Sequence, residues 1–230
     1  MDTKWLKVLN AEITSCRLCP RLVAHREKVA REKRRAYRDW EYWGRPVPGF
    51  GDPRARVLVL GLAPGAHGSN RTGRMFTGDG SGDFLYPVLY RAGFASQPDA
   101  TDRDDDLRLR GLYITAAARC APPDNKPAPA ELANCSAFLD RELEGLSHVR
   151  VVVALGRVAF DAFLRHLKRR GLIETARGMV FRHGARYRLP GGRTLLASYH
   201  PSMQNTQTGR LTRPMFLRIF RAARRLAETD

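Results

Sequence analysis

The residues with the clearest chemical potential lie in and around one glycine-rich stretch, residues 61–82, which reads GLAPGAHGSNRTGRMFTGDGSG. Within it, Asp79 can stabilise a developing cation or orient a water molecule, and Phe76 offers a flat face on which a planar ring can stack. His200, near the other end of the chain, can donate a hydrogen bond to a developing anion. Together these side chains can stack, hydrogen-bond and carry out acid–base chemistry.

The position of this stretch favours a binding function. It directly follows the apolar run 57–60, which is typical of a buried parallel strand. Open α/β sheets place their ligands at the carboxyl ends of such strands. Glycine permits positive φ and a close approach of ligand to backbone, and loops of this length are uncommon unless they are functional. We therefore interpret residues 61–82 as a ligand-binding loop and not as an idle surface connection.

Each of the three side chains also fits an ordinary structural role. Asp79 lies among glycines and can cap the N-terminus of a helix. His200 can be a structural loop residue, and Phe76 can belong to the core. Function is favoured for His200 because it follows the apolar run 194–198, whose end we expect to lie beside the glycine-rich loop.

Four cysteines form a second group of chemically active residues. Cys16 and Cys19 have CxxC spacing, whereas Cys120 and Cys135 are separated by a proline-rich loop and the start of a helix. Unligated thiols, a structural zinc ion and a four-iron four-sulfur cluster are all compatible with this set. Zinc sites usually use two tight CxxC hairpins, so the wide second spacing favours the cluster modestly over zinc. A disulfide framework is not expected in a cytoplasmic protein of this size.

The charge balance predicts a polyanionic partner. The chain has 40 Lys and Arg residues against 23 Asp and Glu residues, a net charge of +17 and a pI near 10.7. Such a surplus suits nucleic acid, because each phosphate contact releases counterions. Codon bias would explain arginine in place of lysine, but not the excess of basic over acidic residues. We find no membrane span and no signal peptide, so we expect a cytoplasmic protein.

Short apolar runs alternate with amphipathic segments along the chain. This alternation predicts one α/β domain over residues 1–230, with a parallel sheet covered by helices on both faces. We expect strands at 57–60, 112–115, 151–155 and 194–198. We expect helices at about 2–15, 21–43, 82–92, 129–144, 158–167 and 213–227, and a basic excursion at 171–193.

The stretch 21–43 carries eight Lys or Arg residues and ends in a group of aromatic residues, namely Tyr37, Trp40, Tyr42 and Trp43. A solvated helix face is the usual explanation for such a run of charge. Because aromatic and basic residues are interleaved, the alternative is a wall beside a binding groove.

Several motifs together resemble the family 5 (type-B) uracil-DNA glycosylases over nearly the whole chain. They are CRLCPRLV at 16–23, PGFGDP at 48–53, GLAPGAHGSNRTGR at 61–74, FTGDGSG at 76–82, the RCAPPxNKP pattern at 119–127 and LASYHPSMQNTQTGRLT at 196–212. The resemblance implies a three-layer α/β/α sandwich with a four-stranded parallel sheet. It also implies a DNA repair glycosylase that hydrolyses the N-glycosidic bond of uracil and leaves an abasic site.

The resemblance further implies a 4Fe-4S cluster on four cysteines, which here match Cys16, Cys19, Cys120 and Cys135. It predicts damaged double-stranded DNA as the partner, and we expect a monomer. Two positions depart from the neighbouring family 4, which has an acid where Leu62 stands and an asparagine at the position of Ala116. Resemblance to family 5 predicts both departures, together with a wider substrate range that includes hypoxanthine and xanthine.

We predict that Asp79 acts near C1′ of the sugar and that His200 acts near the base carbonyl. Substrate contacts are predicted for the backbone of residues 61–65, which we call the backbone cradle and which includes Gly61, Ala63 and Gly65, and for the ring of Phe76. The resemblance suggests two further substrate contacts, from the loop residues Asn125 and Asn205. DNA contacts are predicted in the polar part of the loop and in residues 201–212, which we expect to wedge into the duplex: Asn70, Arg71, Arg74, Gln204 and Arg210.

Two other classes of protein remain as alternatives. One is an iron–sulfur nucleic-acid-binding or redox-sensing protein without glycosylase activity. The other is a zinc-bound phosphosugar enzyme that uses the glycine-rich loop for phosphate.

Overall fold

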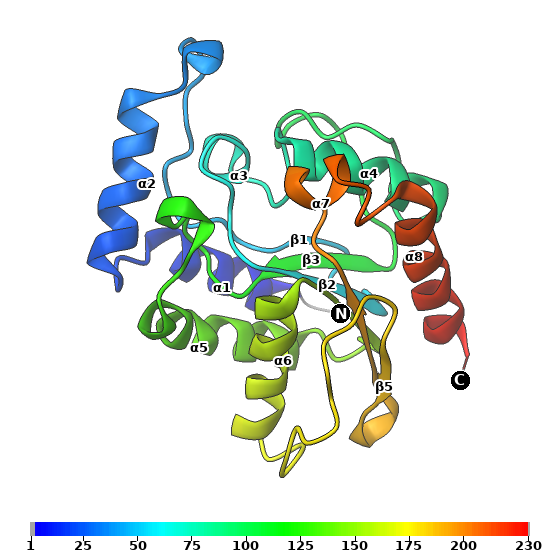
Figure 1. Ribbon diagram of the computed structural model, residues 1–230. Helices are drawn as coiled ribbons and strands as arrows, with labels where there is room; N and C mark the ends of the chain where they lie inside the picture. Colours follow the sequence, from blue (N-terminus) through cyan, green and yellow to red (C-terminus); the bar gives the residue numbers. More distant parts are fainter. Residues whose placement is uncertain (1–2, 230) are drawn as a thin grey trace.

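The computed structural model describes residues 3–229, and a six-stranded sheet forms its centre (Figure 1). From one edge to the other, the strands are β1 (Phe50–Gly51), β3 (Leu112–Ala116), β2 (Val57–Gly61), β4 (Val151–Leu155), β6 (Thr194–Ser198) and β5 (Arg186–Arg188). The middle four are parallel, which confirms the predicted parallel strands. The short edge strands β1 and β5 are antiparallel to their neighbours and were not predicted.

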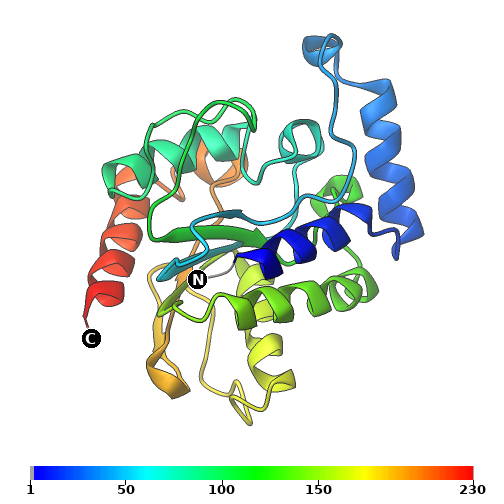
Figure 2. The same ribbon diagram turned by 180° about the vertical axis from the view of Figure 1, so that it is seen from behind.

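Helices cover both faces of the sheet and complete the predicted three-layer α/β/α sandwich (Figures 1 and 2). One face packs against α4 (Gly80–Arg91) and α8 (Arg213–Glu228), and the other packs against α1 (Lys4–Ser15), α5 (Pro129–Gly145) and α6 (Arg157–Arg169). In Figure 2, α1 and α5 lie side by side. Within residues 3–229, no helix has the length and apolar character needed to cross a bilayer.

The two cores follow from the alternation of side chains along buried strands. In β2, Val57 and Val59 face the core under α4 and α8, whereas Leu58 and Leu60 face the core under α5 and α6. Every residue of the four parallel strands is buried, as expected for strands covered on both faces. Because these strands are parallel, their carboxyl ends share one edge of the sheet.

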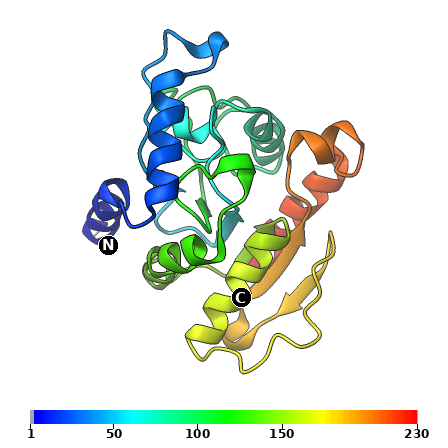
Figure 3. The same ribbon diagram turned by 60° about the vertical axis from the view of Figure 1, so that its left-hand side comes forward.

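Three shorter or outlying helices complete the chain: α2 (Pro20–Glu32), α3 (Ser69–Thr72) and α7 (Met203–Gln207). In Figure 3, α2 stands upright at the side of the molecule and contacts α3. The predicted helix at 21–43 is wrong beyond residue 32. Lys33 has a φ of 52°, in the left-handed region that ends a helix, and only a 3-10 turn follows at Arg35–Tyr37.

Other boundaries differ less. The helix expected at 2–15 is α1, and residue 2 lies outside the described residues. The glycine-rich loop contains the short helix α3, and α4 begins inside it. The basic excursion at 171–193 contains β5 and a 3-10 turn.

A buried carboxylate joins α5 to β3. Glu142 is fully buried and accepts hydrogen bonds from Tyr113 Oη at 3.2 Å and Thr115 Oγ1 at 2.5 Å. It also pairs with Arg119 Nη2 at 2.6 Å, and Arg119 is itself 1% exposed. A buried charge is stable only when it is paired and hydrogen-bonded, so these four groups form one interdependent network. The network connects the helix that carries Cys135 to the segment that carries Cys120.

We predict that Glu142→Gln lowers the free energy of unfolding by about 3–5 kcal/mol, because it leaves the buried Arg119 without a counter-charge. Urea denaturation at neutral pH measures the change. Glu228→Gln is the matched control, since its ion pair with Arg224 at 3.0 Å is about half exposed and is worth at most about 1 kcal/mol. Equal losses in the two variants would contradict the role given to Glu142.

Candidate active site

The loop after β2 and the segment after β6 meet at the carboxyl edge of the sheet. The rings of Phe76 and His200 lie 5.8 Å apart between centroids, with 31° between their planes. A Cβ added to Gly80 would lie 3.4 Å from Cγ of Met203, so the start of α4 contacts α7. The structure therefore brings His200 into the same region as Phe76 and Asp79, although it is far from both in sequence.

Asp79 caps a helix with one carboxylate oxygen and places the other beside the glycine-rich loop. Its Oδ1 accepts hydrogen bonds from the backbone N–H groups of Ser81 at 3.0 Å and Gly82 at 3.2 Å, which caps α4. Its Oδ2 faces the loop, because a Cβ at Gly65 or Gly68 would lie 2.7 or 1.9 Å from this oxygen. Burial raises the pKa of Asp79, and the two backbone hydrogen bonds oppose part of that rise. One oxygen thus holds the helix, and the other is a poorly solvated carboxylate oxygen beside the glycines.

Phe76 is held in an unusual backbone conformation with a φ of 54°. A bulky residue rarely adopts this region, and it persists only where neighbours enforce it. A Cβ at Gly82 would lie 1.9 Å from the Phe76 carbonyl oxygen, and one at Gly61 would lie 2.9 Å from the ring. The ring therefore packs directly on the backbone at the end of β2. Only 8% of Phe76 is exposed, so it presents a small part of its surface.

His200 is a neutral imidazole at pH 7. Burial lowers its pKa from the ordinary value of 6.5 to about 4. A neutral imidazole keeps one N–H, which can donate to a carbonyl oxygen without the cost of burying a cation.

The segment after His200 is anchored by its own hydrogen bonds. Asn205 Nδ2 donates to the His200 carbonyl at 2.8 Å, so this side chain binds the protein backbone. Gln204 is exposed, and Arg210 is exposed with its guanidinium carbon 4.5 Å from the centroid of the Tyr199 ring. The two DNA contacts predicted in this segment therefore involve accessible side chains.

The predicted backbone cradle offers few polar side chains. Gly61 pairs in register with Ala116 at the ends of β2 and β3, and Leu62 follows directly. The carbonyl groups of Gly61 and Leu62 accept backbone hydrogen bonds from the segment after β3, at 3.0 and 2.9 Å. The Gly65 carbonyl accepts from a backbone N–H of α3, and Ala63 is half-buried. Neither position 62 nor position 116 supplies a polar group.

Asn70 and Arg74 are internal, which corrects the prediction that they contact DNA. Arg74 is 4% exposed and forms a two-bond ion pair with Asp105 at 2.7 and 2.6 Å. Asn70 is fully buried, and its Nδ2 donates to the Arg26 carbonyl at 3.2 Å. Side chains whose donors are committed inside the protein do not reach a phosphate.

Arg71 is also internal, and it joins the loop to residues 33–45, which we call the basic–aromatic arm. Its Nε and Nη2 donate to the carbonyls of His67 and Gly78, both at 2.8 Å. Its guanidinium carbon lies 4.0 Å from the ring centroids of both Tyr37 and Trp40. In place of the predicted DNA contact, Arg71 fixes the backbone immediately before Asp79.

Asn125 belongs to the segment that follows β3. It is exposed in the 3-10 turn Pro123–Asn125 after β3, with a φ of 56°. Within the described part of the chain, no hydrogen bond joins its side chain to Asp79 or His200.

The four free cysteines come from three elements that converge near α2. Cys19, Cys120 and Cys135 are buried, and Cys19 and Cys120 pack around Leu22. Burial raises the pKa of the Cys120 thiol to about 11, although Arg26 opposes this shift. Residues 3–229 contain no group of three or more His, Cys, Asp or Glu side chains placed to hold a metal ion.

Arg26 shows whether these residues fit an anionic iron–sulfur group. It is 2% exposed, and its Nη1 donates to Cys120 Sγ at 2.9 Å. The carboxylate within ion-pair range is Glu27, at 3.9 Å. A buried guanidinium is stable only when negative charge lies close to it, and Arg26 has one carboxylate, at the edge of ion-pair range. Iron-bound thiolates would supply further negative charge. The charge of Arg26 therefore fits such a cluster, although the thiols of residues 3–229 are not placed as a metal site in this structure.

The individual contacts of Tyr42 and Glu142 were not predicted from the sequence. Tyr42 Oη lies 3.0 Å from His67 Nδ1 and joins the arm to the loop. The aromatic group at 37–43 was the available signal for Tyr42. Glu142 had none, because it resembles any acidic residue in an amphipathic helix.

Comparison with known proteins identifies the family. The family model described as the uracil DNA glycosylase superfamily matches residues 48–224. The type-5 uracil-DNA glycosylase of Thermus thermophilus is 63% identical over 215 residues, which cover 94% of this chain and 95% of that protein. The type-5 enzyme of Mycobacterium bovis is 53% identical, covering 95% and 81% of the two chains, and that of Pyrobaculum aerophilum is 45% identical, covering 95% and 92%. The chain therefore belongs to the uracil-DNA glycosylase superfamily, as a member of its type-5 family.

Proposed function

We propose that this protein removes uracil, hypoxanthine and xanthine from double-stranded DNA by hydrolysing the N-glycosidic bond. The observation that carries the proposal is the convergence of Asp79, Phe76 and His200 at the carboxyl edge of the sheet. The chain also belongs to the uracil-DNA glycosylase superfamily. Type-5 relatives with this name cover nearly the whole chain, which disfavours a binding or redox-sensing protein without glycosylase activity.

Substrate binding requires that the damaged nucleotide leave the base stack, at a cost of a few kcal/mol. In the proposed complex the extruded base lies against Phe76, with backbone groups of the loop at its edge. The exposed side chains of Gln204 and Arg210 contact the duplex, and α7 occupies the space that the base has left. We expect the protein to act as a monomer.

The chemical step breaks the bond between C1′ and the base nitrogen, and the electron pair leaves with the base. Positive charge develops on the sugar, as in glycoside hydrolysis, and negative charge develops on the base. The Asp79 carboxylate stabilises the cation and orients the water that adds to C1′, and its raised pKa makes it a better proton acceptor than an exposed aspartate. His200 donates its N–H to the base carbonyl and stabilises the departing anion.

The wide range of bases is inferred from what the cradle lacks. Strict discrimination needs buried polar side chains that only the correct base can satisfy. Leu62 and Ala116 provide no such group at the ends of β2 and β3. A cradle that relies on backbone groups tolerates purines and pyrimidines that present a ring carbonyl beside a ring N–H, as uracil, hypoxanthine and xanthine all do.

We further propose that Cys16, Cys19, Cys120 and Cys135 hold a 4Fe-4S cluster. When bound, the cluster would cross-link the N-terminal segment, the loop after β3 and α5 through iron–thiolate bonds. The buried Arg26 would offset its negative charge. This role is structural, and no catalytic step depends on it.

Asp79→Asn should lower single-turnover base release by about 10²–10³-fold at saturating enzyme, because the charge is lost while asparagine still caps α4. Quenched-flow release of uracil from a duplex measures this rate. Asp83→Asn, which removes an exposed carboxylate in the first turn of the same helix, should stay within about twofold of the unchanged protein. An unchanged rate in Asp79→Asn would remove Asp79 from the mechanism.

The substrate proposal is tested by release assays on matched duplexes that contain uracil, hypoxanthine or xanthine, each followed by alkaline cleavage of the abasic site. We expect all three to be cut. Ala116→Asn should favour uracil over the purines, since it adds a polar group beside Gly61. Cleavage of uracil alone by the unchanged protein would refute the wide range but leave the glycosylase proposal intact.

Iron and sulfide analysis tests the cluster. The protein purified without oxygen should contain about four iron atoms and absorb broadly near ~400 nm, as thiolate-to-iron charge transfer does. Cys135→Ser should lose iron and unfold at lower urea concentration. A colourless protein with one zinc ion per chain would refute the iron–sulfur proposal in favour of a structural zinc site.

A further inference from the structure

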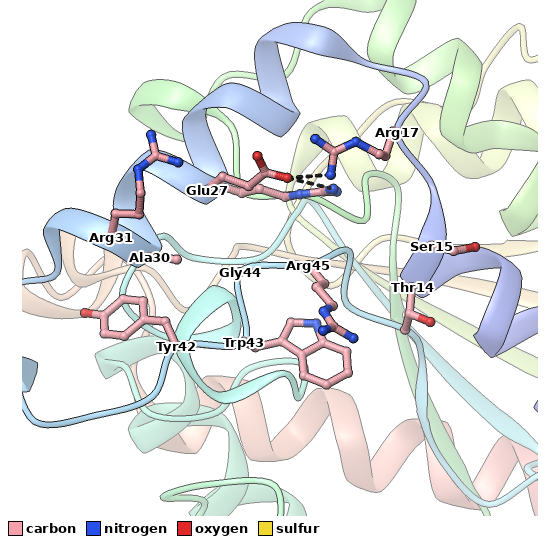
Figure 4. Close-up of a pocket in the computed structure, with 11 residues that line it drawn as sticks. Thr14, Ser15, Arg17, Glu27, Ala30, Arg31, Tyr42, Trp43, Gly44 and Arg45 are labelled. Atoms are coloured by element: carbon pink, nitrogen blue, oxygen red, sulfur yellow. Dashed lines mark hydrogen bonds and ion pairs between the residues drawn. The ribbon is translucent and has the colours of Figure 1, made fainter.

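A basic pocket lies between α2 and the end of the basic–aromatic arm (Figure 4). Its volume is about 510 Å³. In Figure 4, Tyr42, Trp43 and Arg45 form one wall, and Glu27 and Ala30 form the opposite one. The walls meet at Gly44, where an added Cβ would lie 2.9 Å from that of Ala30.

The charge of this pocket is strongly unbalanced. Its lining contains one carboxylate, Glu27, and four guanidinium groups, those of Arg17, Arg26, Arg31 and Arg45. Arg17 pairs with Glu27 at 2.6 Å. Among residues 3–229, Arg31 and Arg45 have no carboxylate within ion-pair distance, and both are exposed. The exposed cations Arg31 and Arg45 line the same pocket as the buried cation Arg26, and together they favour binding of an anion.

The wall that carries Arg45 is rigid and is bonded to the glycine-rich loop. The Trp43 N–H donates to the Arg71 carbonyl at 2.8 Å, and the Gly44 N–H donates to the Asn70 carbonyl at 3.0 Å. The Trp43 indole N–H donates to the Pro46 carbonyl at 3.1 Å, and a Cβ at Gly73 would lie 2.8 Å from the indole ring. An anion in this pocket is therefore held at a fixed distance from the loop that carries Asp79.

We propose that this pocket binds a phosphate of the DNA backbone on one side of the lesion, through Arg31 and Arg45. The inference rests on the proposed function, because it takes DNA as the ligand. A phosphodiester fits the observations better than a small free anion does, because the two arginines are exposed, whereas a site for a free ion would enclose it. The pocket adds a second point of attachment, which fixes the direction of the strand across the site.

The test measures equilibrium binding to duplexes that carry a tetrahydrofuran abasic-site analogue, which cannot be cleaved. One set extends beyond the lesion on both sides, and two sets are truncated on one side or the other. The unchanged protein should lose about tenfold in affinity when one particular side is truncated. Arg31→Gln/Arg45→Gln should bind the full duplex about tenfold more weakly and should show no further loss on truncation of that side.

Salt dependence gives a second readout. The slope of log K against log salt should fall by about 2 in Arg31→Gln/Arg45→Gln, as expected for two lost phosphate contacts. Arg221→Gln/Arg225→Gln removes the same charge from the exposed face of α8 and is the matched control. It should leave both the affinity and the slope close to those of the unchanged protein.

Three outcomes would overturn the proposal. Equal losses in the two double variants would show a general effect of net charge. Unchanged DNA binding in Arg31→Gln/Arg45→Gln would leave the pocket to a partner of another class, such as an acidic protein. Protection against thermal unfolding by millimolar inorganic phosphate, lost in the variant without any effect of duplex length, would assign the pocket to a free anion.

The proposed function fails separately. If the unchanged protein releases no base but shows the side-dependent loss of affinity, the glycosylase proposal is wrong and the phosphate pocket stands. If the unchanged protein releases uracil but its affinity does not depend on the length of the duplex on either side of the lesion, the glycosylase proposal stands and the phosphate pocket is wrong.

Discussion

The site depends on a single carboxylate whose two oxygens have different environments. Asp79 Oδ1 caps α4, and Oδ2 occupies space that a Cβ at Gly65 or Gly68 would fill. These glycines are therefore required by the volume of the carboxylate as much as by the path of the backbone. Burial raises the pKa of Asp79 because the ionised form loses hydration, and the cap limits that cost to one oxygen. A desolvated carboxylate is poorly stable by itself, which makes it effective beside a developing cation.

Some arginines of the chain are buried and stabilise the fold, whereas others are exposed and accessible to a partner. The net charge of +17 does not show which arginines belong to which group. Arg26, Arg71, Arg74 and Arg119 are buried and hold the protein together. Arg74 and Arg119 pair with buried or half-buried carboxylates, whereas Arg71 bonds to two carbonyls and lies against two aromatic rings. Only the exposed arginines, such as Arg210, are accessible to a polyanion, so fewer basic groups are accessible to it than the composition suggests.

The central strands could be predicted because their signal is local. Each is a short buried segment dominated by apolar residues, and in β2 and β4 the apolar run is followed at once by glycine. The edge strands β1 and β5 are two and three residues long, and they exist only because a distant partner provides hydrogen bonds. The sequence also singled out Asp79, Phe76 and His200 by type and position, and their roles in base release stay predictions. It misassigned Arg71 and Arg74, because burial of a guanidinium depends on partners such as Gly78 and Asp105, which spacing along the chain does not reveal.

The basic–aromatic arm is bonded to the loop that carries Asp79. Arg71 lies between Tyr37 and Trp40 and also holds the Gly78 carbonyl, one residue before Asp79. Trp43 is bonded to the same loop through the Arg71 carbonyl. A phosphate held at Arg45 and a sugar held at Asp79 would therefore be positioned by one continuous set of short contacts. Catalysis is sensitive to displacements of about 1 Å. Contacts far from the scissile bond can thus contribute to the rate, because binding energy gained there is used to hold C1′ in place.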